Sequence, residues 1–164
     1  MNKGLEVIEA KVLFDMPYDK IDVLLHRESI IHSMVEYEDT SVIAQLGTPD
    51  MRVPIQYALS WPQRLEAKRA RLDLSAIGKL TFRAPDERRF PCLKLVKQAC
   101  ETGGCATAIL AAADEWAVKA FLEGRIGYLD IANTVERCLE NAPTFRCDSL
   151  DSIMEANDWV WRFL

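Results

Sequence analysis

The segment that begins at Pro91 constrains the fold more than any other feature of this sequence, because its pattern is helical to the end. Apolar residues recur at helical spacing in stretches at about 91–101, 105–123, 128–140 and 149–162. Only short interruptions separate them, at Gly103-Gly104, between Gly124 and Gly127, and around Pro143. Short connections place consecutive amphipathic helices antiparallel to one another. We therefore predict an antiparallel helical bundle over residues 89–164.

The first 61 residues mix helical and strand patterns. A helix is expected from about Asn2 to Asp15, because Pro17 disfavours helical backbone at the residue before it. The elements expected after it are a short strand at 21–25, a hairpin over 30–46 and a helix over 50–61.

Residues 62–88 lack a regular pattern, which favours a linker. They include a basic patch, Arg64 to Arg71, that suits either a phosphate contact or a solvated linker. The predicted fold class is α+β, with a small antiparallel sheet and helices in residues 1–61, the linker at 62–88 and the bundle at 89–164.

The composition limits the classes of partner. A net charge of −5 disfavours binding to nucleic acid or to an anionic membrane surface. The longest uncharged apolar run, Cys105–Ala113, is too short to span a membrane, and the N-terminus lacks the apolar region of a signal peptide. We therefore expect a cytoplasmic protein with no nucleic-acid or membrane partner.

The five cysteines do not form a metal or disulfide pattern. They include no CxxC pair and have no histidine nearby, which disfavours zinc. Cys100 and Cys105 flank a Thr-Gly-Gly turn, but no functional disulfide between them is expected. Reduced thiols are the expectation for a cytoplasmic protein.

The N-terminal motif Met1 to Glu6 (MNKGLE) places polar groups at the start of the first helix. Asn2 and Lys3 lie where a helix offers unpaired N–H groups and the positive end of its dipole, which together suit a phosphate. Glu6 follows one turn later on the same face. The alternative is a solvated Lys/Glu pair without a function.

Four stretches, in order and at natural distances, carry a resemblance to a known family. They are NKGLEVIEA (2–10), SIIHSMVEY (29–37), AQLGTPDMRVPI (44–55) and RFPCLKL (89–95). Together they resemble the 1-deoxy-D-xylulose 5-phosphate reductoisomerases, oxidoreductases and isomerases that use NADPH and a divalent metal in non-mevalonate isoprenoid biosynthesis. The resemblance covers nearly all of this chain but only the C-terminal portion of the family: part of the catalytic domain and the C-terminal helical domain.

The resemblance implies roles for five residues. Asn2 and Lys3 match residues that hold the substrate phosphate, and Glu6 matches one of three carboxylates that bind Mg²⁺ or Mn²⁺ at the catalytic centre. His32 matches a histidine near the substrate, with a structural role in the hairpin as the alternative. Met51 matches a methionine that packs beside the nicotinamide of NADPH, with loop or core filling as the alternative. A homodimer is also implied.

The sequence departs from the family at several positions. His26-Arg27-Glu28-Ser29 stands where the family usually reads HPQS, which leaves the conformation of this turn in doubt, and we interpret His26 as structural. Thr40 replaces the usual glycine of the hairpin turn, and AAADE at 111–115 replaces NAANE.

The chain also lacks a strand–GxGxxG–helix nucleotide site and two of the three metal carboxylates. We therefore expect it to bind neither NADPH nor metal well and to be inactive alone. Its expected partners are 1-deoxy-D-xylulose 5-phosphate and a complementing N-terminal nucleotide-binding half. The alternative is a non-catalytic remnant or interaction module.

Overall fold

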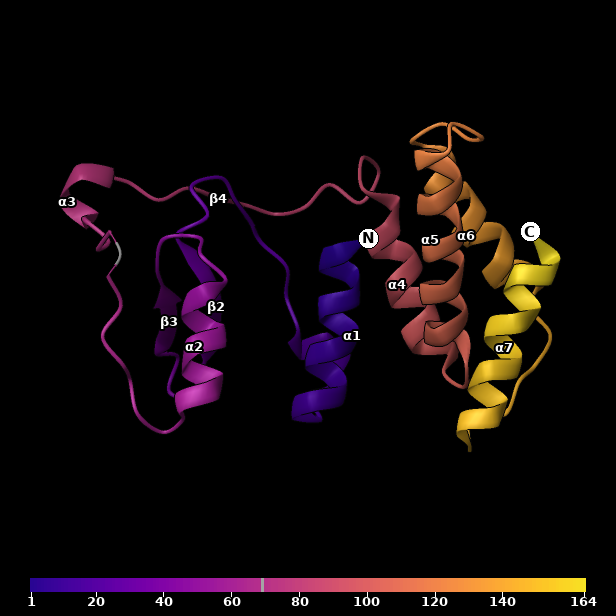
Figure 1. The fold of residues 1–164 in the computed structure, drawn as a ribbon, viewed down its shortest axis with the longest axis horizontal. Coiled ribbons are helices and arrows are strands. Elements are labelled where there is room, and N and C mark those ends of the chain that lie inside the picture. The colour runs from indigo at the N-terminus through magenta and orange to yellow at the C-terminus, as the bar shows by residue number, and fades with distance from the viewer. Residues whose placement is uncertain (69) are drawn as a thin grey trace. The chain divides into compact units, whose positions relative to one another are not determined.

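The computed structural model describes residues 1–68 and 70–164, so the predicted basic patch includes one position, residue 69, outside the described residues. The chain forms two compact units. One consists of residues 1–23 and 85–164, and the other of residues 24–84 (Figure 1). Both helices and antiparallel strands are present, which confirms the predicted α+β class.

The first unit is a helical bundle. Its elements are α1 (Asn2–Phe14), the short 3-10 helix η1 (Tyr18–Lys20), α4 (Pro91–Thr102), α5 (Ala106–Leu122), α6 (Asp130–Asn141) and α7 (Leu150–Phe163). Helix α5 is central, since it packs against α4, α6 and α7, while α1 packs against α4 (Figure 1). The predicted bundle helices are confirmed to within two residues at each end.

Small side chains on α5 allow this packing. Ala113, Ala117 and Ala120 are fully buried, so neighbouring helices approach its backbone closely. Larger apolar side chains fill the space between the helices, among them the fully buried Leu110, Val135, Val160 and Cys138. Burying a side chain such as Leu110 contributes about 1.5–3 kcal/mol.

Local signals fix where the helices begin and end. Pro91 occupies the first turn of α4, where a missing N–H costs nothing. Ser149 caps α7: its hydroxyl oxygen accepts a hydrogen bond from the Ser152 N–H, and the Ser152 hydroxyl oxygen accepts one from the Ser149 N–H. Gly103 (φ 70°) and Gly124 (φ 73°) follow α4 and α5 in backbone conformations that other residues avoid.

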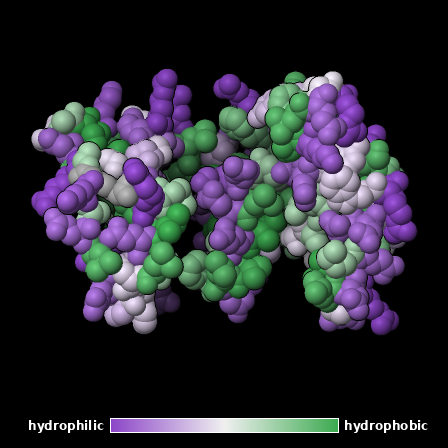
Figure 2. Space-filling model, in the orientation of Figure 1, coloured by the Kyte–Doolittle hydropathy of each residue, from purple (hydrophilic) through white to green (hydrophobic). Residues whose placement is uncertain are grey.

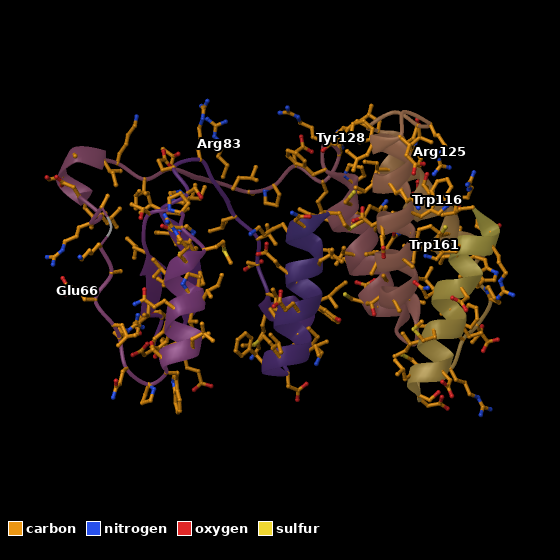
Figure 3. All side chains as sticks on the ribbon, in the orientation of Figure 1. Glu66, Arg83, Trp116, Arg125, Tyr128 and Trp161 are labelled. Atoms are coloured by element: carbon orange, nitrogen blue, oxygen red, sulfur yellow. The ribbon has the colours of Figure 1, made fainter. Side chains whose placement is uncertain are left out.

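Two tryptophans of the bundle unit, on α5 and α7, have cationic side chains over their rings. The Arg125 guanidinium lies 4.9 Å from the centre of the Trp116 ring, and the Lys119 ammonium 5.6 Å from that of Trp161 (Figure 3). In each contact a cation lies over the face of an indole ring, which at an exposed site contributes about 0.5–1 kcal/mol. Among the described residues, no helix combines the length and the apolar character needed to cross a membrane.

The second unit contains the predicted hairpin. Strands β2 (Ile31–Glu36) and β3 (Val42–Leu46) are antiparallel, with Glu36 opposite Val42 and a bulge between Ile31 and Ser33. Helix α2 (Arg52–Ser60) follows, as expected, and α3 (Leu74–Ile77) is a single turn. Strands β1 (Leu25–His26) and β4 (Phe82–Arg83) form a second, two-stranded sheet.

The strand expected at 21–25 was placed too early. Only Leu25 and His26 find a partner, because β4 offers just Phe82 and Arg83 for pairing. Thr40 adopts φ 69° in a three-residue turn, in which the Thr40 N–H bonds to the Tyr37 carbonyl and the Tyr37 N–H to the Ser41 carbonyl. This turn type normally has glycine at the third position, so Thr40 takes on backbone strain.

By contacts, residues 1–23 group with the bundle rather than with the hairpin. The sequence predicted a functional division at residues 61 and 88 into catalytic, linker and bundle parts. The grouping by contacts does not test functional roles, so this division stays a prediction. The segment called a linker contains α3 and β4 among its described residues.

Candidate functional site

The N-terminal end of α1 holds three of the five predicted site residues, Asn2, Lys3 and Glu6. The Met1 carbonyl accepts hydrogen bonds from the N–H groups of Gly4 (2.7 Å) and Leu5 (3.1 Å). The N–H groups of Asn2 and Lys3 precede this first bond and have no acceptor within the helix. With the positive end of the helix dipole, they make a local environment that favours an anion.

Lys3 and Glu6 form an ion pair on the exposed side of this turn. The Lys3 Nζ atom lies 2.7 Å from Glu6 Oε2, and both side chains are more than half exposed. Helical spacing alone predicts this contact. An exposed pair of this kind contributes at most about 1 kcal/mol, so the ammonium can turn to another anion at little cost.

Gly4 fixes where this turn lies within its unit. It is the buried residue of α1, and a Cβ at this position would collide with the side chain of Val96 on α4. The missing side chain therefore lets the start of α1 lie directly on the bundle, with Asn2, Lys3 and Glu6 facing outward.

Glu6 does not by itself make a metal site. Among the described residues, no group of three or more His, Cys, Asp or Glu side chains could hold an ion. Mg²⁺ takes six oxygen ligands and keeps several waters beside its carboxylates, and the Glu6 carboxylate already faces an ammonium. The residues present do not fit a divalent ion without further ligands from elsewhere.

His32 lies on β2 in the other unit. Its Nε2 atom is 3.1 Å from the Gly47 carbonyl oxygen, and because a carbonyl only accepts, Nε2 carries the proton. The ring thereby ties the start of β2 to the loop after β3. Nδ1 is left as a hydrogen-bond acceptor on an exposed side chain.

Met51 precedes α2 and its side chain is 72% exposed. It therefore does not fill the core of this unit, and both a plain loop position and a contact with a nicotinamide stay open for this residue. A flexible thioether in this position is able to cover an apolar ring.

The predicted site residues fall into two groups. Asn2, Lys3 and Glu6 lie together on one helix turn, whereas His32 and Met51 belong to residues 24–84. Each group lies within a single unit.

The turn at His26–Ser29, whose conformation the sequence left in doubt, is held by a cluster of hydrogen bonds to Thr81. The Glu28 carboxylate accepts hydrogen bonds from the Thr81 N–H (3.0 Å) and hydroxyl (2.7 Å). These bonds lower the pKa of Glu28 from 4.5 to about 2, and the bond from the Thr81 hydroxyl has the larger effect.

His26 completes this cluster. Its Nε2 accepts from the Ile30 N–H, so the proton is on Nδ1, which lies 2.9 Å from the Thr81 carbonyl oxygen and 3.1 Å from Glu28. The ring also stacks on Phe82. His26 is thus structural, as interpreted, and it fixes the backbone that leads into β2.

Solved structures define the class of protein to which this fold belongs. The 1-deoxy-D-xylulose 5-phosphate reductoisomerase from Zymomonas mobilis in complex with NADPH matches 97% of this chain, and the match covers 42% of that structure, with a TM-score of 0.91 and 45% identity. A DOX-P reductoisomerase in complex with NADPH, fosmidomycin and magnesium matches 99% of the chain, over 42% of its own length, with a TM-score of 0.93 and 42% identity.

Sequence comparison leads to the same family. The family described as DXP reductoisomerase C-terminal domain matches residues 46–163. The 1-deoxy-D-xylulose 5-phosphate reductoisomerase of Lysinibacillus sphaericus is 58% identical over 96% of this chain and 42% of the relative's length. That of Pseudomonas syringae pv. syringae is 54% identical, over 96% of this chain and 40% of its own length.

The chain belongs to the DXP reductoisomerase family and corresponds to its C-terminal portion. It spans about two-fifths of the length of the curated relatives it matches. The resemblance inferred from the four sequence stretches is confirmed.

Proposed function

We propose that this chain is the C-terminal portion of an NADPH- and divalent-metal-dependent 1-deoxy-D-xylulose 5-phosphate reductoisomerase, and that it is inactive alone. A complementing N-terminal half supplies the nucleotide site, and the completed enzyme is a cytoplasmic homodimer. The observation that carries the proposal is the turn of Asn2, Lys3 and Glu6, kept together and exposed in a chain of this family.

In this proposal the first turn of α1 binds the substrate phosphate. The free N–H groups at the start of α1 and the Lys3 ammonium place positive charge at the exposed helix end. Asn2 lies at the same end. Lys3 leaves Glu6 for the phosphate, since the dianion is the stronger partner. This exchange frees the Glu6 carboxylate as one oxygen ligand for Mg²⁺ or Mn²⁺ in the completed enzyme.

The second unit contributes His32 and Met51. The acceptor nitrogen Nδ1 of His32 suits a hydroxyl of the sugar, because the Gly47 carbonyl holds the ring by its other nitrogen. The exposed Met51 thioether would pack against the nicotinamide of NADPH in the completed enzyme.

The test is complementation. The chain is mixed with an N-terminal half taken from the Lysinibacillus sphaericus relative, ending where the match to this chain begins, and NADPH oxidation is followed with 1-deoxy-D-xylulose 5-phosphate and Mg²⁺. We expect activity in the mixture and none with either part alone. Glu6→Gln in this chain lowers the rate of the mixture at least 100-fold, since an amide is a poor ligand for a hard cation.

Glu9→Gln is the matched control, because Glu9 is also exposed on α1. It leaves the rate of the mixture within about twofold. If the folded chain binds the N-terminal half but the mixture oxidises no NADPH, the catalytic proposal is overturned. That result would favour the alternative, an interaction module derived from the enzyme. Equal losses for both variants would show that Glu6 acts through helix stability rather than through a metal.

A further inference from the structure

Two cysteines that lie far apart in the sequence meet at the start of α5. The Cys105 Sγ atom lies 3.4 Å from the carbonyl oxygen of Arg146, the residue before Cys147, and 3.8 Å from that of Ser152. The Cys147 side chain lies near enough to contribute to the raised pKa of the Cys105 thiol. Both are free thiols in this structure.

The backbones of the two segments are also close. A Cβ added to Gly104 would lie 3.3 Å from the Phe145 carbonyl oxygen, so the segment 145–147 runs directly over residues 104 and 105. Cys147 follows α6 in a stretch without regular structure, which can adjust its backbone by small amounts. A disulfide needs Cα atoms about 4.4–6.8 Å apart, and we infer that a small adjustment of this stretch brings Cys105 and Cys147 into that range.

The two thiols differ in access. Cys105 is 3% exposed, and burial together with its neighbour Cys147 raises its pKa. Cys147 is exposed to solvent. An oxidant in solution therefore reaches Cys147 first, and the Cys105 thiol is held beside the oxidised Cys147 side chain.

We propose that Cys105 and Cys147 form a disulfide when the protein meets a hydroperoxide. The Cys147 thiolate attacks the peroxide, the O–O bond breaks, and Cys147 becomes a sulfenic acid while hydroxide leaves. The Cys105 sulfur then attacks the Cys147 sulfur, and the sulfenic hydroxyl leaves with the Cys105 proton as water. Hydroperoxide is reduced, the two thiols are oxidised, and an external dithiol reverses the bond.

The bond would fasten one wall of a cavity. The space between α4, α5 and α6 has a volume of about 620 Å³ and is lined in part by Gly104, Cys105, Thr144 and Phe145. The cross-link would tie the Thr144–Phe145 wall to the start of α5 and would enclose α5 and α6 in a covalent loop. Neither cysteine is among the residues proposed for substrate, metal or nucleotide.

The test is peptide mapping of the folded chain after treatment with hydrogen peroxide. Digestion after Glu101 separates Cys100 from Cys105, and digestion after Arg146 isolates Cys147. We expect a linked pair of the Cys105 and Cys147 peptides, with the loss of two hydrogens from the intact mass. The melting temperature of the oxidised chain rises relative to the reduced chain, because the closed loop restricts the unfolded state.

Variants separate this outcome from general oxidation. Cys147→Ser loses both the linked pair and the rise in melting temperature, while Cys105→Ser leaves a sulfenic acid on Cys147 that dimedone traps. Cys92→Ser, the matched control, keeps the linked pair and the rise. A Cys147 sulfonic acid beside an unmodified Cys105, or a link from Cys147 to any other cysteine, overturns the proposal.

Discussion

At the scale of single residues, Gly4 has the most direct effect on packing. Replacing it by alanine gains about 1 kcal/mol of helix propensity. The new methyl group would collide with the Val96 side chain, and overpacking of this kind costs about 1–3 kcal/mol. We expect Gly4→Ala to lower the free energy of unfolding by about 1 kcal/mol net, measured from the urea midpoint.

The control for Gly4 is the double variant Gly4→Ala, Val96→Ala. Removing the Val96 methyl groups vacates the space that the new methyl group needs, so the loss from Gly4→Ala should vanish when it is measured in the Val96→Ala background. If Gly4→Ala stabilises the chain in both backgrounds, the close approach of α1 to α4 is not set by this glycine.

Single residues also mark where sequence reasoning stops. The contact of Lys3 with Glu6 follows from helical spacing. Nothing local indicates that Cys105 meets Cys147, or that Asp114 on α5 is left with a buried carboxylate oxygen that has no hydrogen-bond partner. Burial raises the pKa of Asp114. Both facts depend on how separate helices pack, which no short stretch of sequence contains.

At the scale of elements, Glu28 links the start of the hairpin unit to its end. The pKa of Glu28 is lowered from 4.5 to about 2, chiefly by the hydrogen bond from the Thr81 hydroxyl. Because the folded pKa is the lower one, the carboxylate stabilises the fold above about pH 4.5, and this contribution is lost as the pH falls through 2. We expect Glu28→Gln to speed hydrogen exchange at the Thr81 amide at neutral pH, with the difference from the parent chain closing between pH 4.5 and 2.

Glu38→Gln provides the comparison for this experiment, since Glu38 is exposed in the hairpin turn. It should leave exchange at Thr81 unchanged over the whole pH range. A difference for Glu28→Gln that persists undiminished at pH 2 would mean that the amide disturbs the hydrogen-bond geometry and that the charge of Glu28 is irrelevant.

Elements with long, repeated patterns were the ones that the sequence could place. The bundle helices are periodic over three or more turns, and a glycine, a proline or a serine cap marks at least one end of each, so their limits were predicted closely. The pairing of β1 with β4 was not, because each strand has two residues and the partners are more than fifty positions apart. The ordered Glu28–Thr81 contact was missed for the same reason.

At the scale of the whole molecule, the two units differ in how much apolar surface they bury. Among the described residues of 24–84, Ile30 is the one buried apolar side chain, and all the others belong to the bundle unit. In the hairpin, Val35, Val42 and Ile43 are more than half exposed. The C-terminal end of α1 also exposes Val12, Leu13 and Phe14 (Figure 2). Exposed apolar surface of this extent is typical of a region that binds another protein surface.

This difference predicts unequal stability within one chain. A unit held mainly by backbone hydrogen bonds opens more easily than one with a packed core, so amides of β2 and β3 should exchange at least 100-fold faster than those of α5. Hydrogen exchange followed by mass spectrometry measures both in one sample. Adding the complementing N-terminal half should slow exchange in the hairpin while the α5 amides, buried already, serve as the internal reference. Equal protection of hairpin and α5 in the isolated chain would contradict this, since it would require a source of stability in residues 24–84 other than buried apolar surface.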